Sequence, residues 1–240
     1  LTGPMTVQSW RKLDETKIQD PDRLVVIFDH LVPPPTEQAA NAQQTMRDFV
    51  EEQGIRNFYD IGRGGICHQV MPEKGHVHPG DAIVGADSHT CTYGAFGAFS
   101  TGIGSTEMAA VLATGRLWFK VPSTIKINVH GSFAPFVASK DLILHVLGRL
   151  GVSGANYRGI EFSGPTIEEM SIAERMTLCN MSVEAGAKTG IVAPDTRTAE
   201  YLSAAGRGSF QPLRSDEDAT YERTIDVEAS TLAPQIARPH

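Results

Sequence analysis

The sequence RLVVIFDHLVPPPTEQAANAQQTMRDFVEEQGIRNFYDI, residues 23–61, places a helical pattern between two short apolar runs. The apolar run at each end has the length and composition of a buried strand. Between them, residues 36–53 carry apolar side chains at helical spacing, and Gly54 supplies the expected helix stop. A strand, a helix and a second strand in this order favour parallel pairing. We therefore expect an α/β fold with mostly parallel sheets flanked by helices.

Pro122 marks the expected boundary between two domains, residues 1–121 and residues 122–240. Residues 124–131 alternate apolar and polar side chains, which predicts a strand with one face in water. His130 lies on that wet face and is interpreted as a solvated surface residue. The other elements expected are a strand that ends within 83–88 and helices at 106–119, 139–151 and 171–186, with N-caps at Ser105, Ser139 and Ser171.

The composition is that of an ordinary protein with a sizeable core, since 41% of its 240 residues are hydrophobic and 20% are charged. A net charge of −7 argues against general binding to nucleic acid or to anionic membranes. No stretch is long and apolar enough to span a membrane, and the start does not resemble a signal peptide, so we expect a cytoplasmic protein. The chain begins with Leu, which suggests a processed or excised piece. Its cysteines, Cys67, Cys91 and Cys179, are widely spaced and suggest neither a disulfide framework nor a zinc site.

The sequence GADSHTCTYGAFGAFSTGIGSTE, residues 85–107, combines ionisable residues with a run of glycines. Asp87, Ser88 and His89 are consecutive, so they cannot meet tip to tip as a catalytic triad does. If the segment is extended, Asp87 and His89 project to one face and Ser88 to the other. A nucleotide loop is disfavoured because Glu107 occupies the place of the third glycine and would repel a pyrophosphate.

Histidines follow three of the apolar strands, in loops that also contain glycine or a carboxylate. Imidazoles that titrate near neutral pH, held by carboxylates, suit acid–base work on a hydroxy acid. Each histidine alone has a plainer interpretation, as a loop cap or a satisfied core residue. His76 and His78 form an H-x-H pair, but the turn around them indicates surface residues rather than metal ligands. The candidate groups are Asp29 with His30, His68, and Asp87 with Ser88 and His89, joined by Glu184 and Asn180, which share one helix face.

Four segments carry a resemblance to a known family: FDH at 28–30, GRGGICHQVMPEKG at 62–75, GADSHTCTYGAFGAFSTGIGSTEMAAVLATG at 85–115 and MTLCNMSVEAGAKTG at 176–190. They resemble the aconitase superfamily, and most of all the large subunits of 3-isopropylmalate dehydratase and its homoaconitase relatives. The likeness covers nearly the whole chain. The T-C-T-Y that follows D-S-H is of the dehydratase type.

The resemblance implies a hydro-lyase that removes water from a small hydroxy di- or tricarboxylate and adds it back the other way round, as in leucine biosynthesis. In that family a [4Fe-4S] cluster acts as a Lewis acid on the leaving hydroxyl. Its cysteine ligands, in G-S-C-T-N and C-x-x-C motifs, have no counterpart in these residues. The chain is thus expected to be the N-terminal part of a large subunit, with the remaining C-terminal part and a small subunit as partners.

The same resemblance implies roles for individual residues. His30, held by Asp29, would protonate the leaving hydroxyl, and His68 would sit beside the cluster-bound hydroxyl or water. Thr92 stands where the family has asparagine. The other catalytic residues implied are Asp87, His89 and Glu184, with Glu184 paired to His89, and the substrate-binding residues implied are Ser88, Thr92 and Asn180.

Two alternatives stay open at this point. One is a cluster-free enzyme that kept the histidines and changed its chemistry with a divalent metal. The other is a non-catalytic domain or assembly partner whose site residues are relics. The isolated chain is expected to be inactive without the cluster-binding region, and the sequence does not choose between isopropylmalate, homocitrate and citramalate-type substrates.

Overall fold

The computed structural model describes residues 2–13 and 17–238 and divides the chain into two compact units. Unit 1 comprises residues 1–76, 85–87 and 103–120. Unit 2 comprises residues 77–84, 88–102 and 121–240. The last change from unit 1 to unit 2 falls at Lys120 and Val121, while the domain boundary proposed at 121/122 remains a prediction.

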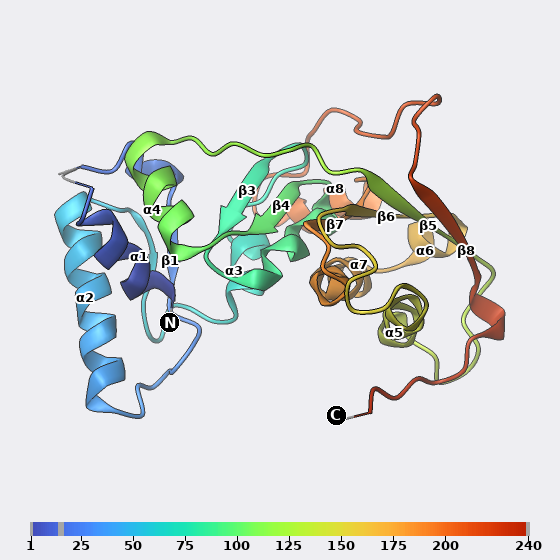
Figure 1. Cartoon of the computed structure of the whole chain (residues 1–240), viewed down its shortest axis with the longest axis horizontal. Coiled ribbons are helices and arrows are strands. Elements are labelled where there is room, and N and C mark those ends of the chain that lie inside the picture. The colour runs from blue at the N-terminus through green and yellow to red at the C-terminus, as the bar shows by residue number, and fades with distance from the viewer. Residues whose placement is uncertain (1, 14–16, 239–240) are drawn as a thin grey trace. The chain divides into compact units, whose positions relative to one another are not determined.

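Unit 1 is built around a strand–helix–strand segment (Figure 1). β1 pairs in parallel with β2, with Val26 opposite Phe58. The Thr36 side chain caps the intervening helix by accepting a hydrogen bond from the Ala39 N–H, and the helix stops at a left-handed Gly54. The parallel pair predicted for residues 23–61 is thus present. The elements of unit 1 are α1 (Thr2–Trp10), η1 (Pro21–Arg23), β1 (Val25–Ile27), α2 (Glu37–Gln53), β2 (Asn57–Tyr59), α3 (Cys67–Glu73) and α4 (Ser105–Thr114).

The core of unit 1 lies between α1, α2, α4 and the two strands. Trp10 of α1 meets Phe49 of α2 edge to face, with ring centroids 5.2 Å apart. Such a pair adds about 1 kcal/mol beyond the area it buries. This packing holds α2 against β1 and β2, whose ends carry the candidate residues. The buried apolar residues are Val7, Trp10, Ile18, Val26, Met46, Phe49, Val50, Ile55, Ala109 and Leu112.

Unit 2 contains a four-stranded sheet in the order β7-β6-β5-β8, and all of its strand pairs are parallel. β3 pairs instead with β4 in a separate sheet, so the strand expected to end within 83–88 does not extend the β1–β2 pair. The remaining elements are β3 (Ala82–Gly85), η2 (Ser88–Phe96), β4 (Phe99–Gly102), β5 (Thr124–His130), α5 (Ser139–Leu150), β6 (Gly159–Ser163), α6 (Pro165–Glu169), α7 (Ile172–Met181), η3 (Ser182–Ala185), β7 (Thr189–Val192), α8 (Thr196–Ser203), β8 (Arg223–Glu228) and η4 (Ala229–Thr231).

The alternation predicted for β5 is confirmed. Ile125, Ile127 and Val129 are buried, whereas His130 at the end of the strand is exposed. Because α7 begins with the capping box of Ser171 and continues as η3 up to a left-handed Gly186, the helix predicted at 171–186 is also present as two consecutive helical segments. The sequence and the structure agree on an α/β fold with parallel sheets and flanking helices.

Two expected helix caps are wrong. Ser105 and Ser139 are the first residues of α4 and α5, and the N-caps are the residues before them, Gly104 and Ala138. Glu107 and Asp141 take over the capping by accepting hydrogen bonds from the N–H groups of Gly104 and Ala138, at 2.9 and 2.8 Å. A carboxylate in the first turn satisfies an orphan donor as well as a serine cap does.

Residues 88–96 form the 3-10 helix η2 rather than an extended strand, so the alternating arrangement of Asp87, Ser88 and His89 is not present. Packing explains the difference, because η2 lies directly against β7. A Cβ atom at Gly94 would lie 1.7 Å from the Gly190 carbonyl oxygen, so only glycine permits this approach.

Candidate functional site

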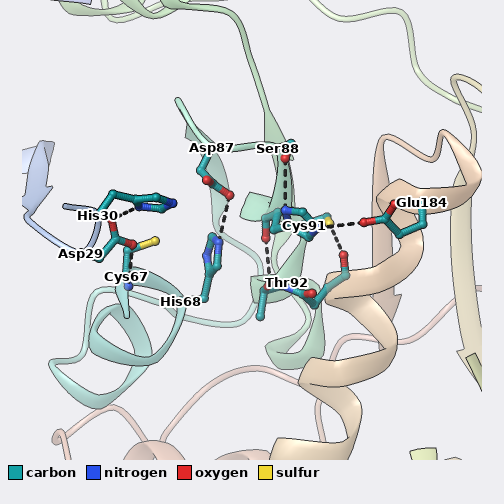
Figure 2. Close-up of polar contacts among 11 residues, drawn as sticks. Asp29, His30, Cys67, His68, Asp87, Ser88, Cys91, Thr92 and Glu184 are labelled. Carbon is teal, nitrogen blue, oxygen red and sulfur yellow. Dashed lines mark hydrogen bonds and ion pairs between the residues drawn. The ribbon is translucent and has the colours of Figure 1, made fainter. Parts of the chain in front are cut away.

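The candidate residues form two groups, each inside one unit (Figure 2). The first, the Asp29 cluster, consists of Asp29, His30, Cys67, His68 and Asp87 in unit 1. The second, the His89 cluster, consists of Ser88, His89, Thr92, Asn180 and Glu184 in unit 2. In the chain they are joined by the peptide bond between Asp87 and Ser88.

Two loops that leave the same edge of the β1–β2 pair supply most of the Asp29 cluster. Asp29 and His30 follow β1, and the loop after β2 leads into α3, which begins at Cys67. Parallel strands place both loops at their carboxyl ends, where α/β proteins bind ligands. Gly64 lets the loops approach closely, since a Cβ there would lie 3.0 Å from the Phe28 carbonyl oxygen.

Asp29 is the hub of its cluster. The His30 Nδ1–H donates to Asp29 Oδ1 at 2.5 Å, and the Cys67 backbone N–H donates to Oδ2 at 3.1 Å. The Cys67 thiol also donates to this carboxylate. Burial by itself raises the pKa of Asp29, but the hydrogen bonds from Cys67 and His30 outweigh it and lower that pKa below its usual value.

The ionised Asp29 assigns the tautomer of His30. A carboxylate can only accept, so the proton of the imidazole must sit on Nδ1. The proton that His30 can gain or lose is then the one on Nε2. The His30 side chain is 63% exposed, whereas that of Asp29 is 14% exposed. This arrangement offers a reachable proton-transfer atom on a ring whose other nitrogen is held in place.

His68 and Asp87 form the second imidazole–carboxylate contact of this cluster. His68 Nε2 lies 3.1 Å from Asp87 Oδ1, and the His68 side chain is 14% exposed. An ionised Asp87 therefore accepts a hydrogen bond from Nε2–H. Since His68 is the second residue of α3, the first turn of that helix orients this ring.

Helix α2 supports both loops with residues that the sequence reasoning missed. Gln43 Nε2 donates to the Leu31 carbonyl oxygen at 3.0 Å, directly after His30. Arg47 donates to both oxygens of Asp60 at 2.7 and 2.8 Å, at the start of the loop after β2. The hydrogen bond from Arg47 lowers the pKa of Asp60. These residues could have been noticed in the sequence as polar side chains on the face of α2 that is expected to be buried. Gln43 on that face is only 8% exposed.

His89 contacts Glu184, as the family resemblance implied. His89 Nε2 lies 3.1 Å from Glu184 Oε1, and Ser88 Oγ lies 3.1 Å from His89 Nδ1. With the carboxylate accepting from Nε2–H, Nδ1 is left to accept from the Ser88 hydroxyl. Side chains thus engage both nitrogens of this ring, which distinguishes it from His30.

Thr92 and Asn180 support the His89 backbone. The Thr92 hydroxyl donates to the His89 carbonyl oxygen at 2.7 Å and accepts from Asn180 Nδ2 at 2.8 Å. Thr92 is only 2% exposed. The structure therefore places it in the interior of unit 2, and we interpret it as a support for His89.

His76 and His78 are partly buried, so their interpretation as surface residues is corrected. His76 Nε2 lies 2.6 Å from the Tyr59 hydroxyl. The two ring nitrogens of His78 each lie 3.0 Å from a backbone carbonyl oxygen, those of Pro79 and Ser209. Both rings serve packing and loop attachment.

The described cysteines do not fit as ligands of an iron–sulfur cluster. Cys67 belongs to unit 1, while Cys91 and Cys179 are buried in unit 2. Burial raises the pKa of the Cys67 and Cys179 thiols, which opposes the thiolate form that binds iron. Within residues 2–13 and 17–238, no set of three or more His, Cys, Asp or Glu side chains is arranged to hold a metal ion. Among the same residues, no helix is long and apolar enough to cross a bilayer.

Comparisons with known proteins match the whole chain. Residues 1–240 match the model of the aconitase family (aconitate hydratase). The chain is 53% identical over 240 residues to a probable 3-isopropylmalate dehydratase large subunit of Methanothermobacter thermautotrophicus, covering 100% of this chain and 57% of that protein. It is 52% identical to a 3-isopropylmalate dehydratase large subunit of Methanopyrus kandleri, again covering 100% of this chain and 57% of that protein.

A probable methanogen homoaconitase large subunit of Methanosarcina mazei is 48% identical over 239 residues, covering 100% of this chain and 61% of that protein. The chain thus spans about three-fifths of the length of the curated relatives it matches. A family match over every residue, together with identities near one half, shows that this chain belongs to the aconitase family.

Proposed function

We propose that this chain is the N-terminal part of the large subunit of a hydro-lyase that isomerises a small hydroxy di- or tricarboxylate, such as 3-isopropylmalate. The observation that carries the proposal is the Asp29–His30 pair in a member of the aconitase family. Loss of water from a hydroxy acid needs a proton at the leaving hydroxyl. His30 has one ring nitrogen held by a carboxylate and an exposed ring, which suits that task.

In this proposal the protonated His30 donates its Nε2 proton as the C–O bond breaks, and the hydroxyl leaves as water. A base from outside these 240 residues would take the proton from the neighbouring carbon, and the electron pair of that C–H bond would form the double bond of the unsaturated product. Asp29 accepts a hydrogen bond from Nδ1–H both before and after His30 gives up its Nε2 proton, so it keeps the ring oriented. Water addition in the reverse sense returns a proton to the same nitrogen, because the two directions share one transition state. Asp29 and His30 therefore act as one acid–base unit.

The other site residues orient groups around this step. We propose that His68, held by Asp87, hydrogen-bonds the departing hydroxyl or the water. His89, held by Glu184, would contribute to the site together with Asp87 and Ser88. Asn180, through Thr92, would maintain the backbone position of His89.

We propose that the complete enzyme carries a [4Fe-4S] cluster as Lewis acid, with ligands from residues outside these 240. The three cysteines of this chain do not fit the role of cluster ligands. The complete enzyme would comprise this chain, the rest of the large subunit and a small subunit, and it would work in the cytoplasm. The isolated chain would be inactive because it lacks the cluster-binding region.

A turnover assay tests this function. The complete large subunit and its small subunit, purified without oxygen, should interconvert the hydroxy acid and its unsaturated product, followed by ultraviolet absorbance. Isopropylmalate, homocitrate and citramalate should be compared in separate assays. We expect turnover of at least one of them that stops when the iron is removed.

The alternatives give different results in the same assay. Turnover of one of these acids by the iron-free protein, dependent on an added divalent metal, would support the cluster-free enzyme. Absence of turnover with every substrate, in a preparation with intact iron and sulfide, would support a non-catalytic assembly partner. Either result would overturn the proposed function.

A further inference from the structure

We propose that Cys67 is a positioning residue, whose thiol and backbone N–H together hold Asp29 in the orientation that fixes His30. Its effect on turnover rests on the proposed function, whereas the contact itself does not. The thiol acts in this proposal as a hydrogen-bond donor. It is neither a nucleophile nor an iron ligand.

The geometry at Asp29 supports this role. Oδ1 is occupied by His30 Nδ1 at 2.5 Å, and Oδ2 is occupied by the Cys67 backbone N–H at 3.1 Å. Figure 2 shows the backbone contact between Cys67 and Asp29. The Cys67 thiol adds a second hydrogen bond from the same residue, which lowers the pKa of Asp29. A carboxylate with both oxygens engaged cannot rotate about its Cβ–Cγ bond without losing a hydrogen bond. Cys67 therefore locks the plane in which Asp29 meets His30.

The thiol remains a donor because its surroundings disfavour ionisation. Burial raises the Cys67 pKa most, and the hydrogen bond to Asp29 and the charges of Asp29 and Asp87 raise it further. Reactive cysteines have the opposite surroundings, with a nearby cation or metal that stabilises the thiolate. Cys67 consequently keeps its proton throughout the neutral pH range.

The position of Cys67 in the chain couples it to the second imidazole. Cys67 and His68 are the first two residues of α3, and they contact Asp29 and Asp87 respectively. The first turn of α3 thus contacts both carboxylates of the Asp29 cluster, those of Asp29 and Asp87. A change at Cys67 should therefore be felt by the Asp29–His30 pair without removing any group that transfers a proton.

Raman spectroscopy of the 240-residue chain tests the contact. The difference between the spectra of the wild type and of Cys67→Ala isolates the Cys67 S–H stretching band, since the other two thiols are common to both. We expect a band at lower frequency than that of an unbonded thiol, with a shift back toward the unbonded frequency in Asp29→Asn. A Cys67 band at the unbonded frequency in the wild type would overturn the proposal.

Turnover tests the consequence in the complete enzyme with its small subunit. Cys67→Ala should lower kcat roughly tenfold, the effect of one hydrogen bond to a charged group, with KM almost unchanged. Cys67→Ser keeps a donor and should restore most of the loss. Without the thiol the pKa of Asp29 rises, so the acid limb of the pH profile should move to higher pH in the alanine variant only.

The outcomes separate the positioning role from the proposed function. Equal kcat values and equal pH profiles in the wild type and Cys67→Ala would overturn the role, even with a shifted Raman band. Equal losses in the serine and alanine variants, or a matching fall in melting temperature, would mean a purely structural residue. A wild-type enzyme without turnover contradicts the proposed function, and the Raman result then decides on the contact alone.

Discussion

At the residue scale, hydrogen bonding distinguishes three histidines of the same intrinsic chemistry. His30 has Asp29 on Nδ1 only, while His89 has Glu184 and Ser88 on its two nitrogens. His130 lies at the end of β5, where Nε2 is 2.8 Å from Asn128 Nδ2 and 3.6 Å from Asp226. Neighbouring groups, rather than the imidazole itself, therefore distinguish His30, which is the proton donor in the proposed function.

This selection leads to a prediction for the complete enzyme. His30→Ala should lower kcat by about 10² to 10⁴-fold, the usual contribution of general acid catalysis, and should change KM by a few-fold at most. His130→Ala removes the same ring from a position outside both clusters and should change kcat very little. Steady-state kinetics of both variants with the cluster and small subunit intact provide the measurement. Equal losses, or a His30 effect confined to KM, would mean that the proton donor is another residue.

At the element scale, a buried arginine connects α7, which carries Asn180, to α8. Arg175 is fully buried, and its Nη2–H groups donate to Asp195 Oδ2 at 2.6 Å and to the Glu168 carbonyl oxygen at 2.9 Å. Asp195 is also the N-cap of α8 through the Thr198 N–H. Burial by itself raises the pKa of Asp195, but the hydrogen bonds from Arg175 and Thr198 outweigh it and lower that pKa.

Removal of this ion pair should destabilise unit 2. Asp195→Asn keeps an N-cap side chain but leaves the buried guanidinium without its counter-charge, which should cost about 3 kcal/mol of unfolding free energy. Glu222→Gln breaks the exposed pair with Arg158 and should cause little change. Urea unfolding of the chain measures both variants. Similar losses in the two would contradict a special role for the buried pair.

The pH dependence of the same pair has a definite sign. The folded-state pKa of Asp195 lies below its ordinary value of 3.8, so the stabilisation is present above that value and is lost as the pH falls through the folded-state pKa. The unfolding free energies of wild type and Asp195→Asn should therefore differ near neutral pH and converge in acid. A constant difference down to the acid limit would show that packing, rather than charge, causes the loss.

At the scale of the whole molecule, the three cysteines are distributed over both units and contact different groups. Cys67 donates to Asp29 in unit 1, and Cys91 donates to the Asn180 carbonyl oxygen in unit 2. Cys179 is buried within α7. The Cys67 and Cys91 thiols thus donate to groups inside their own units, and the Cys179 thiol is buried.

The 240-residue chain alone should therefore bind no [4Fe-4S] cluster. Anaerobic reconstitution with iron and sulfide, followed by desalting, should leave no brown absorbing species, because no suitable set of thiolates is available. Iron and sulfide assays make the result quantitative. Stoichiometric retention that disappears on substitution of Cys67 or Cys91 would contradict this prediction.

The sequence by itself determined the local elements and part of the site. The helical spacing of apolar residues between Thr36 and Gly54 predicts α2, and the alternation of apolar and polar residues predicts β5. Both patterns are local, because a helix or strand with one face on the core repeats its buried positions at its own period. The family resemblance also anticipated the contact between His89 and Glu184, which lie 95 residues apart. Motifs can carry such long-range information, whereas periodicity cannot.

Tertiary structure alone decided the features that depend on packing between distant segments. Residues 88–96 form η2 because they fit against β7 at Gly94, which separates Asp87 from His89 into different units. The donation from Cys67 to Asp29 joins residues 38 positions apart, and no spacing rule indicates it. Such contacts form only when parallel strands bring their loops to one edge of the sheet. The sequence did not indicate them because they depend on the burial of the whole unit rather than on local propensity.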